Sequence, residues 1–85
     1  MAIIFSGSAS EAYQLVPLPV AQWCDAVCDD LEDDPGQAHL REHRYQRHPG
    51  EWLLKRYIAG REWWLVWRRE GDDVVIRHLG ELANT

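Results

Sequence analysis

The residues best suited to chemistry lie in the C-terminal half of the chain, where cations alternate with flat aromatic rings. Lys55, Tyr57 and Trp64 fall in two apolar stretches, and Arg68 and Arg77 follow them. Basic side chains bind phosphate oxygens, and exposed rings stack on unpaired bases, so this mixture suits RNA. Two other interpretations stay open: a solvated sheet face with cross-strand aromatic pairs, and an exposed surface for a protein partner.

A second pattern of interest is His39-Leu40-Arg41-Glu42-His43, which fits the H-x-x-E-H arrangement of one class of zinc peptidase. Such an enzyme needs both histidines on a long helix and a third ligand far downstream. Here Pro49-Gly50 closes the segment after a few residues. We therefore interpret residues 37–50 as a solvated or phosphate-contacting loop, and we expect no metal and no other cofactor.

Three strands are expected to position the basic and aromatic residues, because residues 51–79 contain three β-type runs separated by glycine-containing turns. Hairpin tips at Gly60-Arg61 and Gly71-Asp72 would divide this meander into two faces. The first face would carry Trp52, Leu54, Arg56, Ile58, Trp63, Leu65, Trp67, Arg69, Val74, Ile76 and His78. The second face would carry Leu53, Lys55, Tyr57, Ala59, Trp64, Val66, Arg68, Val75, Arg77 and Leu79.

This register predicts specific neighbours across the strands. Ile58 would lie opposite Trp63, and Trp67 opposite Ile76. On the second face, Lys55, Val66 and Arg77 would form one cross-strand row. Tyr57 and Trp64 would form the adjacent row.

The N-terminal half supplies the layer that would cover the first face. Residues 2–5 form a short β-type run, and Ser8-Ala9-Ser10-Glu11 matches a capping box for a helix that stops by Val16. Pro19 can open a second helix with six apolar residues spaced by three and four. These residues are Val20, Trp23, Cys24, Val27, Cys28 and Leu31. We interpret the two cysteines as small buried thiols.

Together these patterns predict one α+β domain over residues 1–85. Its elements would follow the order β-α-α-β-β-β, with two N-terminal helices packed on one face of a small, mainly antiparallel sheet.

The net charge of −5 hides an asymmetry between the two halves of the chain. Residues 1–40 hold seven acidic side chains and no Lys or Arg, whereas residues 41–85 hold all nine Lys and Arg with seven acids. A local polyanion site fits this pattern, although a dedicated nucleic-acid binder is usually basic overall. The longest apolar run, Trp63 to Trp67, is too short to span a bilayer, and no signal-peptide pattern opens the chain. We therefore expect a cytoplasmic protein without membrane contact.

Nearly the whole chain shares its pattern with a known family. The motifs that carry the similarity are Ile3-Ile4-Phe5-Ser6, Leu31-Glu32-Asp33-Asp34-Pro35-Gly36, Gly50-Glu51-Trp52 with Lys55-Arg56, and Leu65-Val66-Trp67-Arg68 before Val74-Val75-Ile76-Arg77. In this arrangement the chain resembles the RelE/ParE superfamily of bacterial type II toxin–antitoxin toxins. In that family the RelE-like branch cleaves ribosome-bound mRNA without a metal and the ParE-like branch attacks gyrase. An antitoxin protein neutralises both.

The resemblance implies a toxin component, or a relative of one, that acts as a RelE-like endoribonuclease (mRNA interferase). The expected catalytic residues are Lys55, Arg68 and Arg77. The arginines would stabilise charge on the phosphorane, and Lys55 would add a cation or take part in proton transfer. The expected nucleic-acid contacts are Tyr57, Trp64 and Arg61. The expected partners are a cognate antitoxin, mRNA or the ribosome, and a second copy of the chain.

The alternative is a non-catalytic protein-interaction module on the same fold, such as a ParE-like target binder or an inactive homologue. The acidic net charge favours this alternative. So does the segment Gly80-Glu81-Leu82-Ala83-Asn84-Thr85, which lacks the histidine or tyrosine that often follows the last strand of the nuclease branch.

Overall fold

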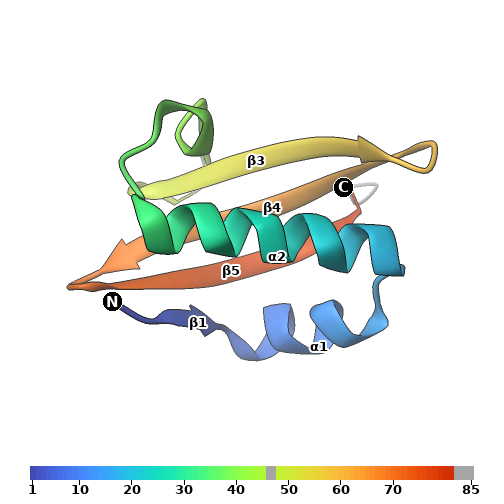
Figure 1. The fold of residues 1–85 in the computed structure, drawn as a ribbon, viewed down its shortest axis with the longest axis horizontal. Helices are drawn as coiled ribbons and strands as arrows, with labels where there is room; N and C mark the ends of the chain where they lie inside the picture. Colours follow the sequence, from blue (N-terminus) through green and yellow to red (C-terminus); the bar gives the residue numbers. More distant parts are fainter. Residues whose placement is uncertain (46–47, 82–85) are drawn as a thin grey trace.

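The described chain forms a five-stranded sheet with two helices on one of its faces (Figure 1). The computed structural model describes residues 1–45 and 48–81. Its elements are β1 (Ile3–Phe5), α1 (Gly7–Leu15), α2 (Leu18–Asp33), the 3₁₀ helix η1 (Ala38–Leu40), β2 (His43–Arg44), β3 (Glu51–Ile58), β4 (Arg61–Glu70) and β5 (Asp73–Glu81). The predicted α+β class and the order β-α-α-β-β-β are confirmed, and β2 is a short addition in the segment predicted to be a loop.

The strand order is β1-β5-β4-β3-β2, so the first and last of the described strands are neighbours. β1 runs parallel to β5, while the other three pairs are antiparallel. The chain between β1 and β5 holds both helices and the other three strands, so it is much longer than the connection of about a dozen residues that a parallel pair requires. Figure 1 shows α2 lying over one face of the sheet, roughly in line with β4 and β5, and α1 beyond the end of β1. One sheet face is therefore packed, and no helix among residues 1–45 and 48–81 covers the other.

The N-cap of helix α1 lies two residues before the predicted cap, Ser8. The cap is Ser6, whose Oγ accepts a hydrogen bond from the Ala9 amide at 3.3 Å. The Ser6 amide also donates to the Ile76 carbonyl of β5 at 2.9 Å, so β1 passes directly into the helix. The predicted start at Ser8 was wrong because this sheet contact fixes Ser6 directly after the last residue of β1, where its side chain caps the helix. The helix ends at Leu15, ahead of Pro17, as expected.

Helix α2 buries the apolar stripe that its spacing predicts. Val20, Cys24, Val27 and Leu31 are buried, and Trp23 and Cys28 pack at the margin of the same core. The core includes Leu54, Trp63, Leu65, Trp67, Val74, Ile76 and Leu79 from the sheet. A stripe of this width supplies the apolar contact that holds helix and sheet together.

Acidic residues on α2 hold neighbouring segments in place. The Tyr13 hydroxyl of α1 donates to Asp25 at 2.7 Å, and His39 of η1 lies 3.0 Å from Asp30. Beyond the helix, the Gly36 amide donates to the Asp34 carboxylate at 2.8 Å. The acids at the end of the helix thus close the turn into η1, a local role that offsets their unfavourable position at a helix C-terminus.

The first hairpin turns at Ala59-Gly60, one residue earlier than predicted. Ala59 has φ 52° and Gly60 φ 82°, the left-handed conformations that a two-residue primed turn requires. Ile58 therefore pairs with Arg61 and Arg56 with Trp63. The predicted pairs of β3 with β4 were displaced by two residues. This displacement changes each cross-strand neighbour but keeps every side chain of these two strands on its expected face.

The second hairpin follows the prediction up to a β-bulge in β5. Trp67 pairs with Ile76 as expected, but Val66 pairs with His78, which leaves Arg77 as the extra residue. The Ser6 hydroxyl donates to the Arg77 carbonyl at 3.1 Å and so fixes the bulge from the β1 side. Beyond the bulge the faces exchange: Leu79 joins the core instead of the second face, and His78 leaves the helix face. Both placements predicted from simple alternation were wrong.

Candidate functional site

The sheet face away from the helices carries five of the six predicted site residues. These are Lys55, Tyr57, Trp64, Arg68 and Arg77. Three apolar residues between them, Leu53, Val66 and Val75, are buried although they lie outside the helix-side core. We call this surface the open face. Its charged and aromatic groups surround a small apolar patch formed by Leu53, Val66 and Val75.

Lys55 and Trp64 are direct partners across β3 and β4. The Lys55 ammonium lies 5.5 Å from the centroid of the Trp64 ring, which is a cation–π distance. The Trp64 indole N–H donates to Glu62 at 2.8 Å, which fixes the plane of the ring. Tyr57 is next along β3 and is 73% exposed. This end of the open face thus presents one cation and two aromatic rings.

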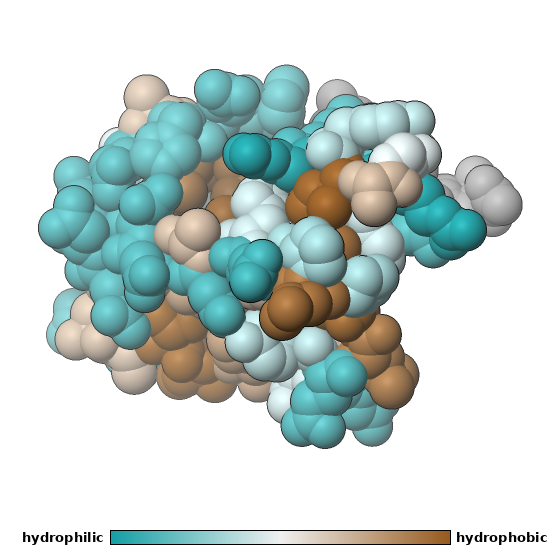
Figure 2. Space-filling view, turned by 45° about the vertical axis from the view of Figure 1, so that its right-hand side comes forward, coloured by the Kyte–Doolittle hydropathy of each residue, from teal (hydrophilic) through white to brown (hydrophobic). Residues whose placement is uncertain are grey.

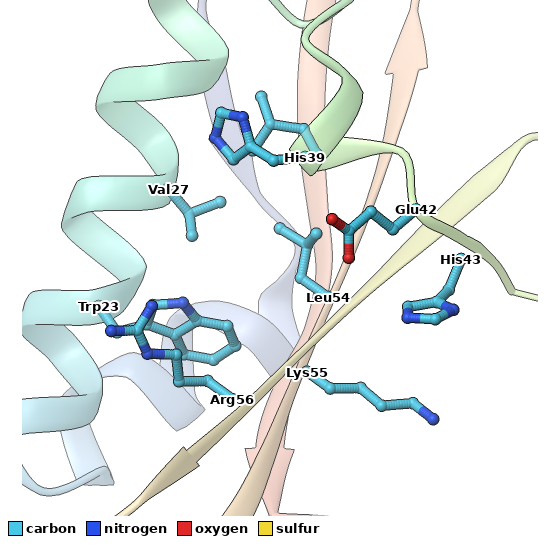
Figure 3. Close-up of a pocket in the computed structure, with 9 residues that line it drawn as sticks. Trp23, Val27, His39, Glu42, His43, Leu54, Lys55 and Arg56 are labelled. Atoms are coloured by element: carbon cyan, nitrogen blue, oxygen red, sulfur yellow. The ribbon is translucent and has the colours of Figure 1, made fainter.

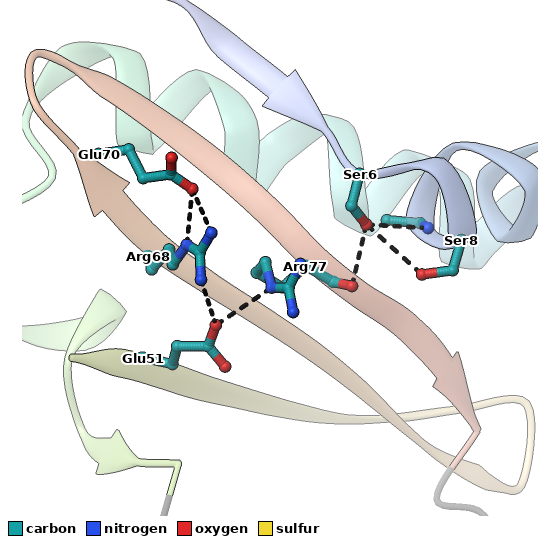
Figure 4. A network of polar contacts seen from close by, with 7 residues as sticks. Ser6, Ser8, Glu51, Arg68, Glu70 and Arg77 are labelled. Carbon is teal, nitrogen blue, oxygen red and sulfur yellow. Dashed lines mark hydrogen bonds and ion pairs between the residues drawn. The ribbon is translucent and has the colours of Figure 1, made fainter. Parts of the chain in front are cut away.

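The two arginines at the other end of the open face share one carboxylate (Figure 4). Glu51 is 3% exposed and lies 3.2 Å from Arg77 Nε and 3.5 Å from Arg68 Nη1. Arg68 also forms an ion pair with Glu70. A buried carboxylate needs such partners, because an unpaired charge there would be costly. Two of the three predicted catalytic cations are therefore neutralised in this structure.

The predicted cross-strand rows do not form. Lys55 faces Trp64, Tyr57 faces Glu62, and the row through Val66 joins Leu53 with His78. The displaced first turn and the bulge in β5 together cause this difference. Lys55 and Arg77 consequently do not flank Val66, and the face separates into an aromatic end and an arginine end.

Arg61 does not join the other predicted site residues. It opens β4 beside the first hairpin turn, and its guanidinium contacts both carboxylate oxygens of Glu81, at 3.0 and 3.1 Å. Arg61 alternates with Glu62 and therefore projects from the helix face. Its expected nucleic-acid contact would require a ligand that passes around the edge of the sheet.

His78 is a member of the open face that sequence alternation missed. The β-bulge places it opposite Val66, and its ring lies over Gly80, where a Cβ would come within 3.4 Å of His78 Nε2. Partial burial lowers the pKa of His78 from its ordinary value of 6.5, because desolvation disfavours the charged imidazole.

A pH dependence of stability follows from His78. The unfolded chain binds a proton more readily below pH 6.5 than the folded chain does, so folding loses stability as the pH falls below that value. We expect the free energy of unfolding to be lower at pH 5.5 than at pH 7.5. Urea titrations at both pH values should show a smaller difference for His78→Asn. An unchanged difference in this variant would exclude His78 as the cause.

The H-x-x-E-H segment lies at the outer edge of the sheet (Figure 3). His39 is in η1 and His43 in β2, so the two histidines do not share a helix. Within residues 1–45 and 48–81, no three His, Cys, Asp or Glu side chains are grouped to hold a metal ion. The segment instead borders a pocket of about 220 Å³ between α2 and β3. Its lining includes Trp23, Val27, His39, Leu40, Glu42, His43, Leu54, Lys55 and Arg56.

A separate exposed apolar group lies at the connection between α1 and α2. Leu15 is 84% exposed and Leu18 is 69% exposed. Figure 2 shows hydrophobic residues reaching the surface among hydrophilic ones on the side that carries this connection. This group comes from the helical layer and is remote from the open face, so it is not part of the candidate site.

Glu51 was not among the predicted site residues, although the alternation along β3 could have identified it. It alternates with Leu53 and Lys55, which already predicts the second face. Its acidic character and its position at the start of the strand gave no sign of burial. Only the lateral approach of Arg68 and Arg77 makes a buried carboxylate at this position tolerable.

No model of a known protein family matches this chain, and no curated protein or solved structure does either. None of the helices among the described residues is long and apolar enough to cross a membrane.

Proposed function

We propose that this protein is a relative of the RelE/ParE toxins that binds unpaired RNA through its open face. The observation that carries the proposal is the group formed by Lys55, Tyr57 and Trp64. One cation and two rings lie together on a sheet surface that no helix covers. Bases can stack on the rings while the ammonium meets a phosphate, an arrangement that binds single strands without strict sequence preference.

Cleavage of mRNA is the finer part of this proposal. Lys55 would be the first cation to meet the scissile phosphate, because its ammonium contacts an aromatic ring and is not in an ion pair within the described residues. Arg77 and Arg68 would stabilise the phosphorane once the phosphate displaces their contacts with Glu51. The proposal includes an antitoxin protein as partner and a cytoplasmic location, where mRNA and ribosomes are found.

Binding to a fluorescent, single-stranded oligouridylate tests the proposal. We expect Tyr57→Ala and Trp64→Ala each to weaken binding about tenfold, since stacking on an aromatic ring contributes about 1–3 kcal/mol per base. Lys55→Ala should also reduce the salt dependence of binding. Arg69→Ala is the matched control, because Arg69 is exposed and donates to the Gly71 carbonyl at the second turn. Equal affinities of the three variants and this control would refute RNA binding at the open face.

A non-catalytic interaction module is the second candidate, and it is favoured by the group of Glu51, Arg68 and Arg77, which we call the Glu51 cluster. A carboxylate between Arg68 and Arg77 cancels charge that a nuclease would direct at the phosphate. Expression in bacteria separates the two candidates. Growth arrest with mRNA cleavage, lost in Lys55→Ala, would support the nuclease. Growth arrest with intact mRNA and unchanged effect of Lys55→Ala would support a protein target.

A further inference from the structure

The outer edge of β3 is only partly occupied by its neighbour. β2 pairs with Trp52 and Leu53 and then departs into the segment that leads back to η1. Among the described residues, no strand pairs with β3 on this side beyond Leu53. In Figure 1 the half of β3 that approaches the first hairpin has no strand on its outer side. About half of the strand is therefore an open edge.

The backbone groups of Lys55 and Tyr57 point out of the sheet at this open edge. The Tyr45 amide donates to the Glu51 carbonyl at 2.9 Å, so Glu51 directs its backbone groups toward β2. In an antiparallel strand every second residue shares that direction, and Lys55 and Tyr57 belong to this set. Their amides and carbonyls form a template that an added strand can complete.

The charges at the edge select the kind of strand that fits. In a symmetric antiparallel pair centred on Lys55 or on Arg56, the central residue faces its own copy, which places like charges directly opposite. This repulsion disfavours a second copy of the chain at the edge. Lys55 and Arg56 are both exposed, one on each side of the strand, and favour acidic side chains opposite them.

The pocket beside the edge provides room for side chains on the helix side of an added strand. Trp23, Val27 and Leu54 form its apolar part, and Arg56 also lines it. Lys55 extends away from Trp23 and Arg56 in Figure 3, toward the open face. An added strand would therefore place alternate side chains in two environments, one apolar and one basic.

We propose that the open edge of β3, at residues 55–57, is a docking site for an extended acidic segment of a partner protein. The segment pairs antiparallel with β3, continues the sheet beyond β2, inserts an apolar side chain toward Trp23 and places a carboxylate near Lys55. This site uses the backbone edge of the sheet, and it shares the side chain of Lys55 with the RNA-binding group proposed above.

A designed peptide tests the docking site on the full chain. The probe is the blocked heptapeptide Thr-Val-Glu-Val-Glu-Val-Thr, and the control replaces both glutamates by lysine. At low salt we expect the acidic peptide to bind at least tenfold more tightly than the basic one. Hydrogen exchange followed by NMR should show at least tenfold protection of the Lys55 and Tyr57 amides. Comparable affinity for both peptides, or protection confined to other strands, would overturn the proposal.

Two substitutions at one position separate backbone pairing from side-chain contact. Tyr57→Ala removes the ring and keeps the outward amide, whereas Tyr57→Pro removes both and leaves the ladder to β4 intact, because that amide faces away from β4. Peptide binding should persist in the alanine variant and be lost in the proline variant. Should the proline variant not fold, N-methylation of both glutamates of the peptide, which lie opposite Lys55 and Tyr57 and direct their amides at β3, removes the donors from the other side. Undiminished binding of the methylated peptide would then contradict strand pairing.

Discussion

Replacing Trp67 by alanine is expected to lower the free energy of unfolding by about 3–5 kcal/mol, the usual cost of truncating a large buried aromatic residue. Trp67 is 0% exposed and lies in the core beneath α2. Its indole N–H donates to the Leu40 carbonyl at 3.0 Å, which attaches η1 to the sheet. The substitution therefore leaves a cavity and an unpaired buried carbonyl together. Urea denaturation followed by circular dichroism measures the loss.

Trp67→Phe separates these two effects. Phenylalanine keeps most of the buried area but removes the donor, so we expect a smaller loss of about 1–3 kcal/mol, the cost of leaving a buried acceptor unsatisfied. Trp52→Phe is the comparison on the neighbouring strand, because Trp52 is only partly buried and packs at the margin of the core. If Trp67→Ala were no more destabilising than Trp52→Phe, the central position of Trp67 would be refuted.

The packed half of this fold follows from sequence periodicity. The stripe on α2 has six apolar positions at helical spacing, and no other face of that segment could be buried. Pro17 and Pro19 fix where one helix ends and the next begins. These signals are local, so they do not depend on contacts with distant parts of the chain. The same holds for the second turn, where Gly71 and Asp72 give the pair Trp67 and Ile76 as predicted.

The errors arise where a distant contact overrides a local pattern. Ser6 caps α1 directly after β1 because it bonds to Ile76 and Arg77, about 70 positions away in the sequence. The bulge at Arg77 has no composition signal, since neither glycine nor proline marks it. One inserted residue reverses the faces of His78 and Leu79 and redirects the rows of the candidate site. Alternation alone cannot supply this information.

The sequence predicted which residues share the open face more accurately than it predicted the ion pairs that these residues form. Alternation within β3 and β4 brought Lys55, Tyr57 and Trp64 to one face, which depends only on parity. The state of Arg68 and Arg77 depends on Glu51, and a side chain paired across three strands is not visible in a linear pattern. A count of basic residues on a face therefore overestimates the charge available to a phosphate.

Replacing Glu51 by glutamine is expected to change stability and RNA affinity in opposite directions. The neutral amide retains the shape but loses two charge-assisted contacts, so the free energy of unfolding should fall by about 1–2 kcal/mol. If the open face binds RNA as proposed, the same change frees Arg68 and Arg77 to bind a phosphate. Affinity for single-stranded oligouridylate should rise by up to about tenfold, or ~1.4 kcal/mol. The salt slope should steepen by about 0.7 for each added phosphate contact.

Glu70→Gln is the matched control for this pair of effects. Glu70 also pairs with Arg68, but its side chain is 50% exposed whereas that of Glu51 is 3% exposed. An exposed ion pair contributes about 0.2–1 kcal/mol, so we expect a smaller loss of stability and a smaller gain in affinity. A stable Glu51→Gln protein whose RNA affinity is unchanged or reduced would mean that the arginines do not meet the phosphate. The Glu51 cluster would then be a structural device that fixes three strands of the open face.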